Sequence, residues 1–580
     1  MKIKSSAILI LFLLIAAACA PVAAPPAAPS GGAAPASTPE PPKEVTRIVQ
    51  GTPEVIVITA TPAPTQAGQA TSAPQPTSAP QPTAAQPSAP TPPPSSGGVL
   101  KVAIPADPGL WDPKFTSDTN GIRAEAQIYA TLMRNTADAK GVEPWLAESY
   151  EASPDLKEVT FHLHKDAKFC DGSPITANDV KFSFDRYLEK DSGVSWQYPQ
   201  GTKVEVPDDY TVKITSEVPS VWFLQAMTLW GTQIMSQKYV SAQSKDDIAA
   251  KPLGSGPFCL KSWDKGTGYV LTRNPGYWDT PAWVDEVDAT VIQDDTARVL
   301  QLESGNVDLV IDVPYNQVDV LSRYPGIHGY TSSLWGLASI VMNQKAVPAL
   351  KDKNVRQAMS YAIDRQALVD AVLFGKGDPA WSVWYGTDLP CYTADFAHKF
   401  DLEKAKQLMA QSTAPNGFKT DLTVVAGDTV GMQTAVILKD QLSKIGVDVN
   451  ITPIEEGSWF SNWSSYNYQM LYKLGTELVN DQAQTIPFDY LTVEDGGQGT
   501  AFTGWSDPDV TRVSKAALIE GDPAKRCQIY YDLQKFAMDQ TPQLVLFHPN
   551  NRWGASDKVY NFSINPTSLY RFWEVWKAQQ

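Results

Sequence analysis

The chain has little of the chemistry on which most enzymes and metal sites depend. Its 580 residues include five cysteines and five histidines, and their spacing fits no zinc motif. It has no phosphate-binding glycine loop, nucleophile elbow or His-Glu-x-x-His motif. His162 and His164 share one face of a strand without a third ligand nearby, and acidic pairs such as Asp294-Asp295 are typical of solvated charge rather than of glycosidase carboxylates. We therefore predict a protein that is not an enzyme and has neither metal nor cofactor.

The apolar run at the N-terminus is too short to cross a membrane. Ala7 to Ala18 is twelve residues long, whereas a spanning helix needs about 20. Lys2 and Lys4 precede this run and Cys19 follows it, which is the pattern of a secretory signal peptide over residues 1–18. The small residues before Cys19 resemble a bacterial lipobox, and an ordinary signal peptide with an incidental cysteine is the alternative. The lipobox resemblance implies an extracytoplasmic protein that is anchored to the cell membrane only by lipidated Cys19.

Aromatic residues and aspartate are missing from residues 20–98, a segment that holds 20 of the 46 prolines. Such a composition buries too little apolar surface to offset the entropy of ordering the chain. We therefore predict that residues 19–97 form a disordered linker rich in Pro, Ala, Thr and Ser. Val55 to Ile58 has strand propensity, but alone it is expected to be a sticky patch rather than a fold.

The remainder of the chain is large and acidic. The net charge of the protein is −16, which argues against nucleic acid or an anionic membrane surface as a partner. About 480 residues exceed the size of a single core, so at least two lobes are expected. The four cysteines of this part allow up to two disulfides in three complete pairings, which the sequence does not separate: Cys170, Cys259, Cys391 and Cys527.

Local patterns predict a mixture of strands and helices. Thr176 and Asp179 have the spacing of a capping box at the start of a helix. The apolar face of this helix would contain Val180, Phe184 and Tyr187, at positions i, i+4 and i+7.

A second pattern indicates parallel strands. Leu422 to Ala426 has the pattern of a strand, Gln433 to Lys444 that of an amphipathic helix and Val447 to Ile451 that of another strand. Gly446 lies where the C-terminal cap of the helix is expected. This βαβ unit predicts an α/β fold with a partly parallel sheet.

Several segments, in order along residues 98–580, resemble one known family. The longest is FHLHKDAKFCDGSPITANDVKFSFDR at residues 161–186. The others are GGVLKVA (97–103), WDP (111–113), EPWLAES (143–149), GSGPF (254–258), NPGYW (274–278), LESGNVDL (302–309) and the segment 355–365, which begins VRQA and ends AIDR. Together they are similar to the extracytoplasmic solute-binding proteins of family 5 of ABC importers, the oligopeptide- and dipeptide-binding type.

The resemblance implies a periplasmic-binding-protein-like Venus flytrap with two α/β lobes. The main subdomain of lobe I would contain residues 98–120, 245–335 and 546–580. Residues 121–244 would form an extra subdomain inserted in lobe I, and residues 336–545 would form lobe II. The chain would cross between the lobes near Trp335 and near His548, and these crossings would form the hinge.

The resemblance also implies a function and its partners. A monomer would capture an oligopeptide between its lobes and deliver it to the transmembrane subunits of an ABC importer. Ligand binding would shift an equilibrium between open and closed states. An oligosaccharide is the alternative ligand, and metal complexes also occur in the family. A wall-bound adhesin would explain the linker but not the family motifs.

Peptide-binding members hold the amine of the peptide with an aspartate after a strand. At that position this chain has Leu478 or Val479, so Glu477 or Asp481 would have to replace the aspartate. Trp459 matches the place where peptide binders have a pocket tryptophan. Aromatic faces stack on sugar rings as well as on peptide side chains, so these residues favour neither ligand strongly. The predicted ligand-binding residues are Thr119, Asn120, Trp335, Trp381, Trp384, Trp459, Trp463, Gly475, Thr476, Glu477 and Asp481.

Overall fold

The computed structural model describes residues 43–49, 52–58, 97–116, 118–491 and 507–578. The predicted signal peptide, Cys19 and most of the linker lie outside these residues. The chain divides into two units, residues 1–85 and 86–580, and each is described by itself. None of the described helices is long and apolar enough to cross a membrane.

The first unit contains a β-hairpin. Strand β1 (Lys43–Val49) pairs antiparallel with β2 (Thr52–Ile58), so that Val45 is the partner of Ile56. Val55 to Ile58, for which strand propensity was predicted, therefore pairs with a second strand of the same segment. The partner strand is hard to recognise in the sequence because Lys43, Glu44 and Arg47 interrupt its apolar residues.

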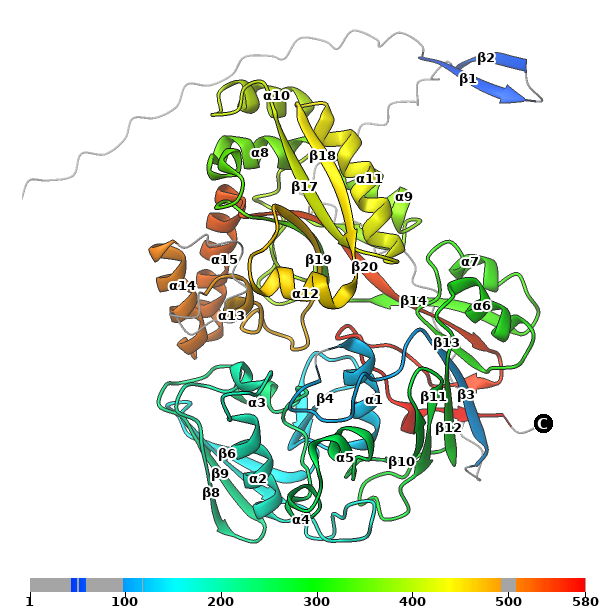
Figure 1. Cartoon of the computed structure of the whole chain (residues 1–580), viewed down its shortest axis with the longest axis vertical. Helices are drawn as coiled ribbons and strands as arrows, with labels where there is room; N and C mark the ends of the chain where they lie inside the picture. The colour runs from blue at the N-terminus through cyan, green and yellow to red at the C-terminus, as the bar shows by residue number, and fades with distance from the viewer. Residues whose placement is uncertain (1–42, 50–51, 59–96, 117, 492–506, 579–580) are drawn as a thin grey trace, which may run out of the picture. The chain divides into compact units, whose positions relative to one another are not determined.

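The second unit is built around a twelve-stranded sheet (Figure 1). Ten of the strands follow the order β10-β11-β12-β3-β13-β20-β15-β19-β17-β18, and β14 and β16 also pair with β20. The strands are β3 (Val99–Ile104), β10 (Phe258–Asp264), β11 (Gly268–Arg273), β12 (Glu286–Val291), β13 (Leu309–Ile311), β14 (Ile327–Ser333), β15 (Gly336–Met342), β16 (Gly377–Pro379), β17 (Phe418–Val425), β18 (Val447–Ile454), β19 (Met470–Thr476) and β20 (Gln543–Ser556).

Strand β20 connects the two halves of this sheet. Its first residues, 543–547, pair with β15, whereas residues 550–556 pair with β14. In one half β3 runs parallel to β12 and β13, and in the other β17 runs parallel to β18 and β19. Parallel pairing confirms the fold class that the βαβ pattern predicted.

The strands of the smaller sheets come from the part of the sequence between β3 and β10 and from the C-terminal segment. One has the order β6-β7-β9-β8, β4 pairs with β5, and β21 pairs with β22. Their bounds are β4 (Met133–Asn135), β5 (Val142–Pro144), β6 (Ala147–Ala152), β7 (Glu158–Leu163), β8 (Lys203–Asp208), β9 (Thr211–Thr215), β21 (Val559–Tyr560) and β22 (Trp576–Lys577).

The helices cover the sheets and fill the connections between them (Figure 1). They are α1 (Thr119–Ile128), α2 (Ala177–Tyr187), α3 (Phe223–Ala226), α4 (Gln237–Ser241), α5 (Lys245–Ala250), α6 (Asp295–Glu303), α7 (Val318–Leu321), α8 (Lys353–Ala362), α9 (Arg365–Val372), α10 (Leu402–Ala410), α11 (Thr429–Ser443), α12 (Glu456–Ser464), α13 (Thr485–Asp489), α14 (Pro508–Ile519) and α15 (Pro523–Gln540), with 3-10 turns at Ser195–Gln197, Pro348–Lys351 and Phe572–Glu574.

Helix α2 begins and packs as its sequence predicts. The backbone N–H of Thr176 donates to the Asp179 carboxylate at 2.9 Å, which completes the expected capping box. Val180, Phe184 and Tyr187 are fully buried, and α2 contacts β8 and β9 (Figure 1).

Helix α11 lies between β17 and β18, but it begins four residues earlier than expected. Asp428 caps its N-terminus by accepting a hydrogen bond from the backbone N–H of Gly431 at 3.0 Å. Gly431 lowers helix propensity in the first turn, which explains why the sequence pattern missed this turn. Gly446 has a φ of 83° and ends the helix as predicted.

Two disulfides resolve the pairing that the sequence left open. Cys170 is bonded to Cys259, with their Cα atoms 5.9 Å apart, and Cys391 to Cys527, with their Cα atoms 5.2 Å apart. The first joins the loop before α2 to β10, and the second joins the segment after β16 to α15.

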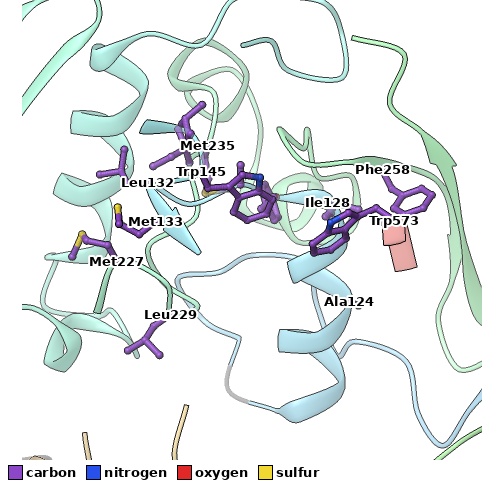
Figure 2. Packing of buried hydrophobic residues seen from close by; sticks show 14 of the residues in the cluster. Ala124, Ile128, Leu132, Met133, Trp145, Met227, Leu229, Met235, Phe258 and Trp573 are labelled. Carbon is purple, nitrogen blue, oxygen red and sulfur yellow. The ribbon is translucent and has the colours of Figure 1, made fainter. Parts of the chain in front are cut away.

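A large apolar core joins the smaller sheets to the first half of the long sheet. Figure 2 shows part of it, with Ile128 on α1, Trp145, Phe258 on β10 and Trp573 near the C-terminus. A second core lies between α8, α9, α11 and the strands β15, β17 and β18. A third contains aromatic residues around Trp335 and Trp384 and borders the site described next.

Candidate functional site

The end of β19 brings the predicted residues around Glu477 next to the connection between β14 and β15. Thr476 is the register partner of Gly336 on β15. The backbone N–H of Glu477 donates to the carbonyl oxygen of Trp335 at 2.7 Å. Glu477 and Trp335 were both predicted, and the fold places them in direct contact.

The Glu477 carboxyl group is fully buried and half satisfied. One oxygen, Oε2, accepts a hydrogen bond from the Thr485 hydroxyl. The other, Oε1, has no hydrogen-bond partner among the described residues. Burial raises the pKa of Glu477 well above its ordinary value, and the charges of Asp481 and Asp489 raise it further. Burial and the neighbouring acidic groups therefore disfavour the ionised form of this carboxyl group.

Asp481, the other candidate, is already engaged within the protein. Its Oδ1 accepts hydrogen bonds from the Tyr530 hydroxyl and, at 3.0 Å, from the backbone N–H of Ala483. Its Oδ2 lies 3.3 Å from a guanidinium nitrogen of Arg526. These partners neutralise the charge, so Asp481 has less capacity than Glu477 to receive a cation.

A buried ion pair completes this cluster. Lys473 on β19 donates from Nζ to Asp489 at 2.7 Å, and both side chains are at most 6% exposed. The Tyr385 hydroxyl donates to the other Asp489 oxygen at 2.7 Å and lies 2.9 Å from Lys473 Nζ. We name Lys473, Glu477, Asp481 and Asp489 the acidic cluster.

Gly475 allows an aromatic ring to reach this cluster. A Cβ atom at this position would lie 2.6 Å from the Tyr385 ring, which is too close for any other residue without a shift. Beyond Tyr385, the buried ring of Trp384 contacts Tyr490 and Tyr530 edge to face. Trp335 donates from Nε1 to Asp388 at 2.8 Å. Trp335 and Trp384 are therefore wall residues with buried rings.

Helix α12 carries two more of the predicted aromatic residues, Trp459 and Trp463. None of its residues is fully buried. The rings of Trp459 and Trp463 are 5.5 Å apart, and Phe460 on the same helix is 51% exposed. Lys473 Nζ lies 5.5 Å from the centre of a Trp463 ring, so α12 adjoins the acidic cluster. The helix offers a half-exposed aromatic surface beside buried charges.

The remaining predicted residues lie on other elements. Thr119 and Asn120 begin α1, where Thr119 is exposed and Asn120 is half-buried. Trp381 is half-buried, and the Arg365 guanidinium lies 5.8 Å from its ring centre.

Sequence reasoning missed two residues of the cluster, Lys473 and Asp489. Lys473 lies inside the apolar strand β19, where a charged residue needs a buried partner, and this was the one available signal. The partner Asp489 is on α13, and no pattern in the sequence links it to the strand.

Residues 121–244 touch the part of the chain that contains the cluster. Asn480 Nδ2 donates to the carbonyl oxygen of Lys140 at 2.8 Å, and the backbone N–H of Val221 donates to that of Leu518 at 3.3 Å. Val479 and Ala483 belong to the same apolar core as the smaller sheets. The acidic cluster therefore lies next to a contact between two segments that are distant in sequence.

Comparison with known proteins gives one matching family. Residues 141–490 match the family model of the bacterial extracellular solute-binding proteins, family 5. The chain is 28% identical to the probable D,D-dipeptide-binding periplasmic protein DdpA of Escherichia coli (strain K12), over 81% of this chain and 92% of that protein. It is 26% identical to the oligopeptide-binding protein AppA of Bacillus subtilis (strain 168), over 84% and 93% of the two chains.

Solved structures show the same fold. The periplasmic binding protein DppA of Helicobacter pylori, in complex with the peptide STSA, has a TM-score of 0.76 and 26% identity. The match covers 84% of this chain and 99% of that one. The binding protein AgaA of A. tumefaciens R10, in complex with agropinic acid, has a TM-score of 0.75 and 25% identity over 83% of this chain and 99% of that chain.

Proposed function

Because the chain belongs to the bacterial extracellular solute-binding proteins of family 5, we propose that it captures an oligopeptide and delivers it to the transmembrane subunits of an ABC importer. Membership in this family confirms the prediction of an extracytoplasmic binding protein with a periplasmic-binding-protein fold. It also confirms that the protein is a binding protein rather than an enzyme. Peptide as the ligand is supported by relatives that are named for peptides and by a neighbouring structure that holds one.

The single observation that favours a peptide amine is the state of Glu477. Its free oxygen Oε1 is buried, and in the ionised carboxylate this oxygen needs an N–H or O–H donor. A ligand ammonium would supply both a donor and a positive charge, which would stabilise the ionised carboxylate. We therefore assign amine binding to Glu477 rather than to Asp481, whose charge Arg526 and Tyr530 already neutralise.

The other predicted residues have graded roles in this proposal. Trp459 and Trp463 would contact ligand side chains from α12. Trp335, Trp384 and Gly475 would shape the wall behind Glu477, and Thr476 would precede it on β19. Thr119, Asn120 and Trp381 stay candidates without a specific role.

The domain organisation is proposed as the sequence indicates it, with lobe I formed by residues 98–120, 245–335 and 546–580, the insertion by 121–244 and lobe II by 336–545. The hinge at Trp335 and His548 is supported by strand β20, which pairs with both halves of the long sheet. The His548 ring nitrogen Nδ1 lies 2.8 Å from the carbonyl oxygen of Gly336, so the two crossings are in contact.

The N-terminal anchor is a separate part of the proposal. If Cys19 is lipidated, Cys19→Ala should move the protein from the membrane fraction to the soluble fraction without changing its affinity for ligand. Cell fractionation followed by immunoblotting measures this shift. A disulfide cysteine such as Cys170, which is bonded to Cys259, is not a suitable control because its replacement would break the disulfide. Unchanged membrane association of the variant would contradict the lipid anchor.

Ligand identity is best tested on protein purified without added ligand. Native mass spectrometry should show peptide adducts, and peptides from a mixed library should raise the melting temperature. Oligosaccharide adducts, or sugars that raise the melting temperature while no peptide does, would overturn the peptide assignment in favour of the oligosaccharide alternative. In that case Trp459→Ala should weaken sugar binding most, because stacking replaces charge as the main contact.

A further inference from the structure

A small cavity lies in the part of the chain that would form lobe I. It is lined by residues of α1, β4, the segment around residues 228–233 and the C-terminal segment 565–573. Its volume is about 70 Å³, which is room for roughly five water molecules or for one small functional group.

The walls of this cavity are aromatic. Trp145 and Trp573, labelled in Figure 2, stack with ring centres 6.0 Å apart and an angle of 20° between their planes. Trp230 lines a further part of the wall and donates from Nε1 to the carbonyl oxygen of Thr116 at 2.9 Å. These rings form apolar parts of the cavity wall.

Two nearly buried amides supply hydrogen-bond donors to the cavity. Gln233 is 4% exposed and Asn135 is 8% exposed. The backbone N–H of Gly231 donates to Gln233 Oε1, so this oxygen is occupied. Asn135 Oδ1 lies 3.3 Å from the Thr228 hydroxyl oxygen, whose single proton is donated to the carbonyl oxygen of Gln225 at 2.8 Å. The NH₂ groups of Gln233 and Asn135 have no acceptor among the residues that the structure describes. Neither nitrogen is among the fully buried side-chain atoms that lack a partner, so both remain open to the cavity and can donate to a bound group.

Other lining side chains add donors and positive charge. Asn565 Oδ1 accepts from the backbone N–H groups of Thr567 and Leu569, both at 3.1 Å, which leaves its NH₂ group as a donor. The charged side chains that line the cavity are Arg134 and Arg571. Both are cations.

The guanidinium partners limit how much of this charge is free. Arg134 donates to Glu143 and Asp279, both at 2.8 Å, and within the described chain its Nη2 has no acceptor. Arg571 is paired with Glu574 at 2.7 Å and donates to the carbonyl oxygen of Asn135. None of the three carboxylates lines this cavity, so its surface is rich in donors and poor in acceptors.

We propose that this cavity is a binding site for a carboxylate group. A carboxylate presents two oxygens that together accept up to about four hydrogen bonds, and no donor, which matches the free NH₂ groups and the two cations. The group could be the end of a captured ligand or a free small carboxylate. Asn565 is next to Pro566, whose carbonyl oxygen accepts from the backbone N–H of Trp335 at 2.7 Å. The cavity wall is therefore continuous with the segment that holds Glu477.

Propionate and propionamide, which have almost the same shape, separate charge from size. At matched ionic strength, propionate should raise the melting temperature of the full chain and change its tryptophan fluorescence. It should bind at least about tenfold more tightly than propionamide, a difference of about 1.4 kcal/mol. Equal effects of the two compounds, or no effect of either, would overturn the proposal.

Variants of the cavity locate the effect. Gln233→Glu and Asn135→Asp replace a donor with an oxygen of similar size and should weaken propionate binding about tenfold or more, whereas Asn416→Asp, at an exposed position, should leave it unchanged. Ala126→Leu, on the cavity face of α1, should fill the space and abolish binding without touching a polar group. This variant keeps the test available if Gln233→Glu or Asn135→Asp fails to fold. Propionate binding retained by Ala126→Leu would place the site elsewhere.

The source of the carboxylate is tested with peptides. If the ligand supplies it, C-terminal amidation should weaken peptide binding to the wild type but not to Gln233→Glu. If amidation has no effect while propionate still binds, the site takes a free carboxylate. This result would also distinguish the two proposals, because a protein that binds propionate but no peptide keeps the cavity site and loses the proposed function.

Discussion

The acidic cluster and the cavity lined by Trp145, Trp573 and Gln233 differ in the kind of polar group that lacks a partner. In the cluster it is an acceptor, Glu477 Oε1, surrounded by further acidic side chains. In the cavity it is a set of donors, the NH₂ groups of Gln233 and Asn135, beside two arginines. A zwitterion such as a short peptide has an ammonium for the first region and a carboxylate for the second. The two regions would then recognise opposite ends of one class of ligand.

We expect the largest effect from a substitution that removes the only cation of the acidic cluster, Lys473. Lys473→Met leaves Asp489 buried without its cation, which should lower the free energy of unfolding by about 3–5 kcal/mol. Urea denaturation followed by fluorescence measures the loss. Lys353→Met removes an exposed ion pair with Asp539 and should cost at most about 1 kcal/mol. Similar losses for both variants would mean that the cluster is not a tightly coupled buried pair.

The next effect separates the two candidate carboxylates. Asp481→Asn weakens contacts to Arg526 and Tyr530 and should cost about 1–3 kcal/mol of stability. Glu477→Gln should cost less, because burial and the nearby acidic groups already disfavour the ionised carboxylate. As a control, Asp509→Asn changes an exposed pair with Arg512 and should stay within about 0.5 kcal/mol. A larger loss for Glu477→Gln than for Asp481→Asn would show that Glu477 has a structural role.

A smaller effect concerns Glu125, a buried carboxyl group on α1 near the cavity. Burial, together with the charges of Asp112 and Asp118, raises its pKa well above the ordinary value of a glutamate. The stability from its protonation is therefore complete below about pH 4.5 and is lost as the pH rises toward the raised pKa. Glu125→Gln should remove this loss, so the variant should gain on the wild type by up to about 1.4 kcal/mol per pH unit. Parallel stability curves between pH 5 and 8 would contradict the raised pKa.

Local signals in the sequence predicted a good part of the fold. The capping box at Thr176 and Asp179 and the cap at Gly446 depend on neighbouring residues only, so they could be recognised directly. The pairing of Cys391 with Cys527, and of Lys473 with Asp489, depends on how distant segments meet. No spacing rule contains that information.

The candidate site was predicted in part for the same reason. Family resemblance pointed to Glu477 and Asp481, and both lie in the acidic cluster. Which of the two is free was decided by Arg526 and Tyr530, which come from α15 and could not be connected to β19 in the sequence. The cavity lined by Trp145, Trp573 and Gln233 was not predicted, because its hydrogen-bond donors come from separate segments of the chain: β4, residues 228–233 and the C-terminal segment.

The central claim, that Glu477 binds the amine of a peptide, is tested most directly by a double-mutant cycle. Isothermal titration calorimetry would compare a bound peptide and its N-acetylated form on the wild type and on Glu477→Gln, with Glu456→Gln, an exposed change, as the control. Acetylation should weaken binding to the wild type by about 2–5 kcal/mol and binding to Glu477→Gln by much less. Equal losses on both proteins would contradict the account.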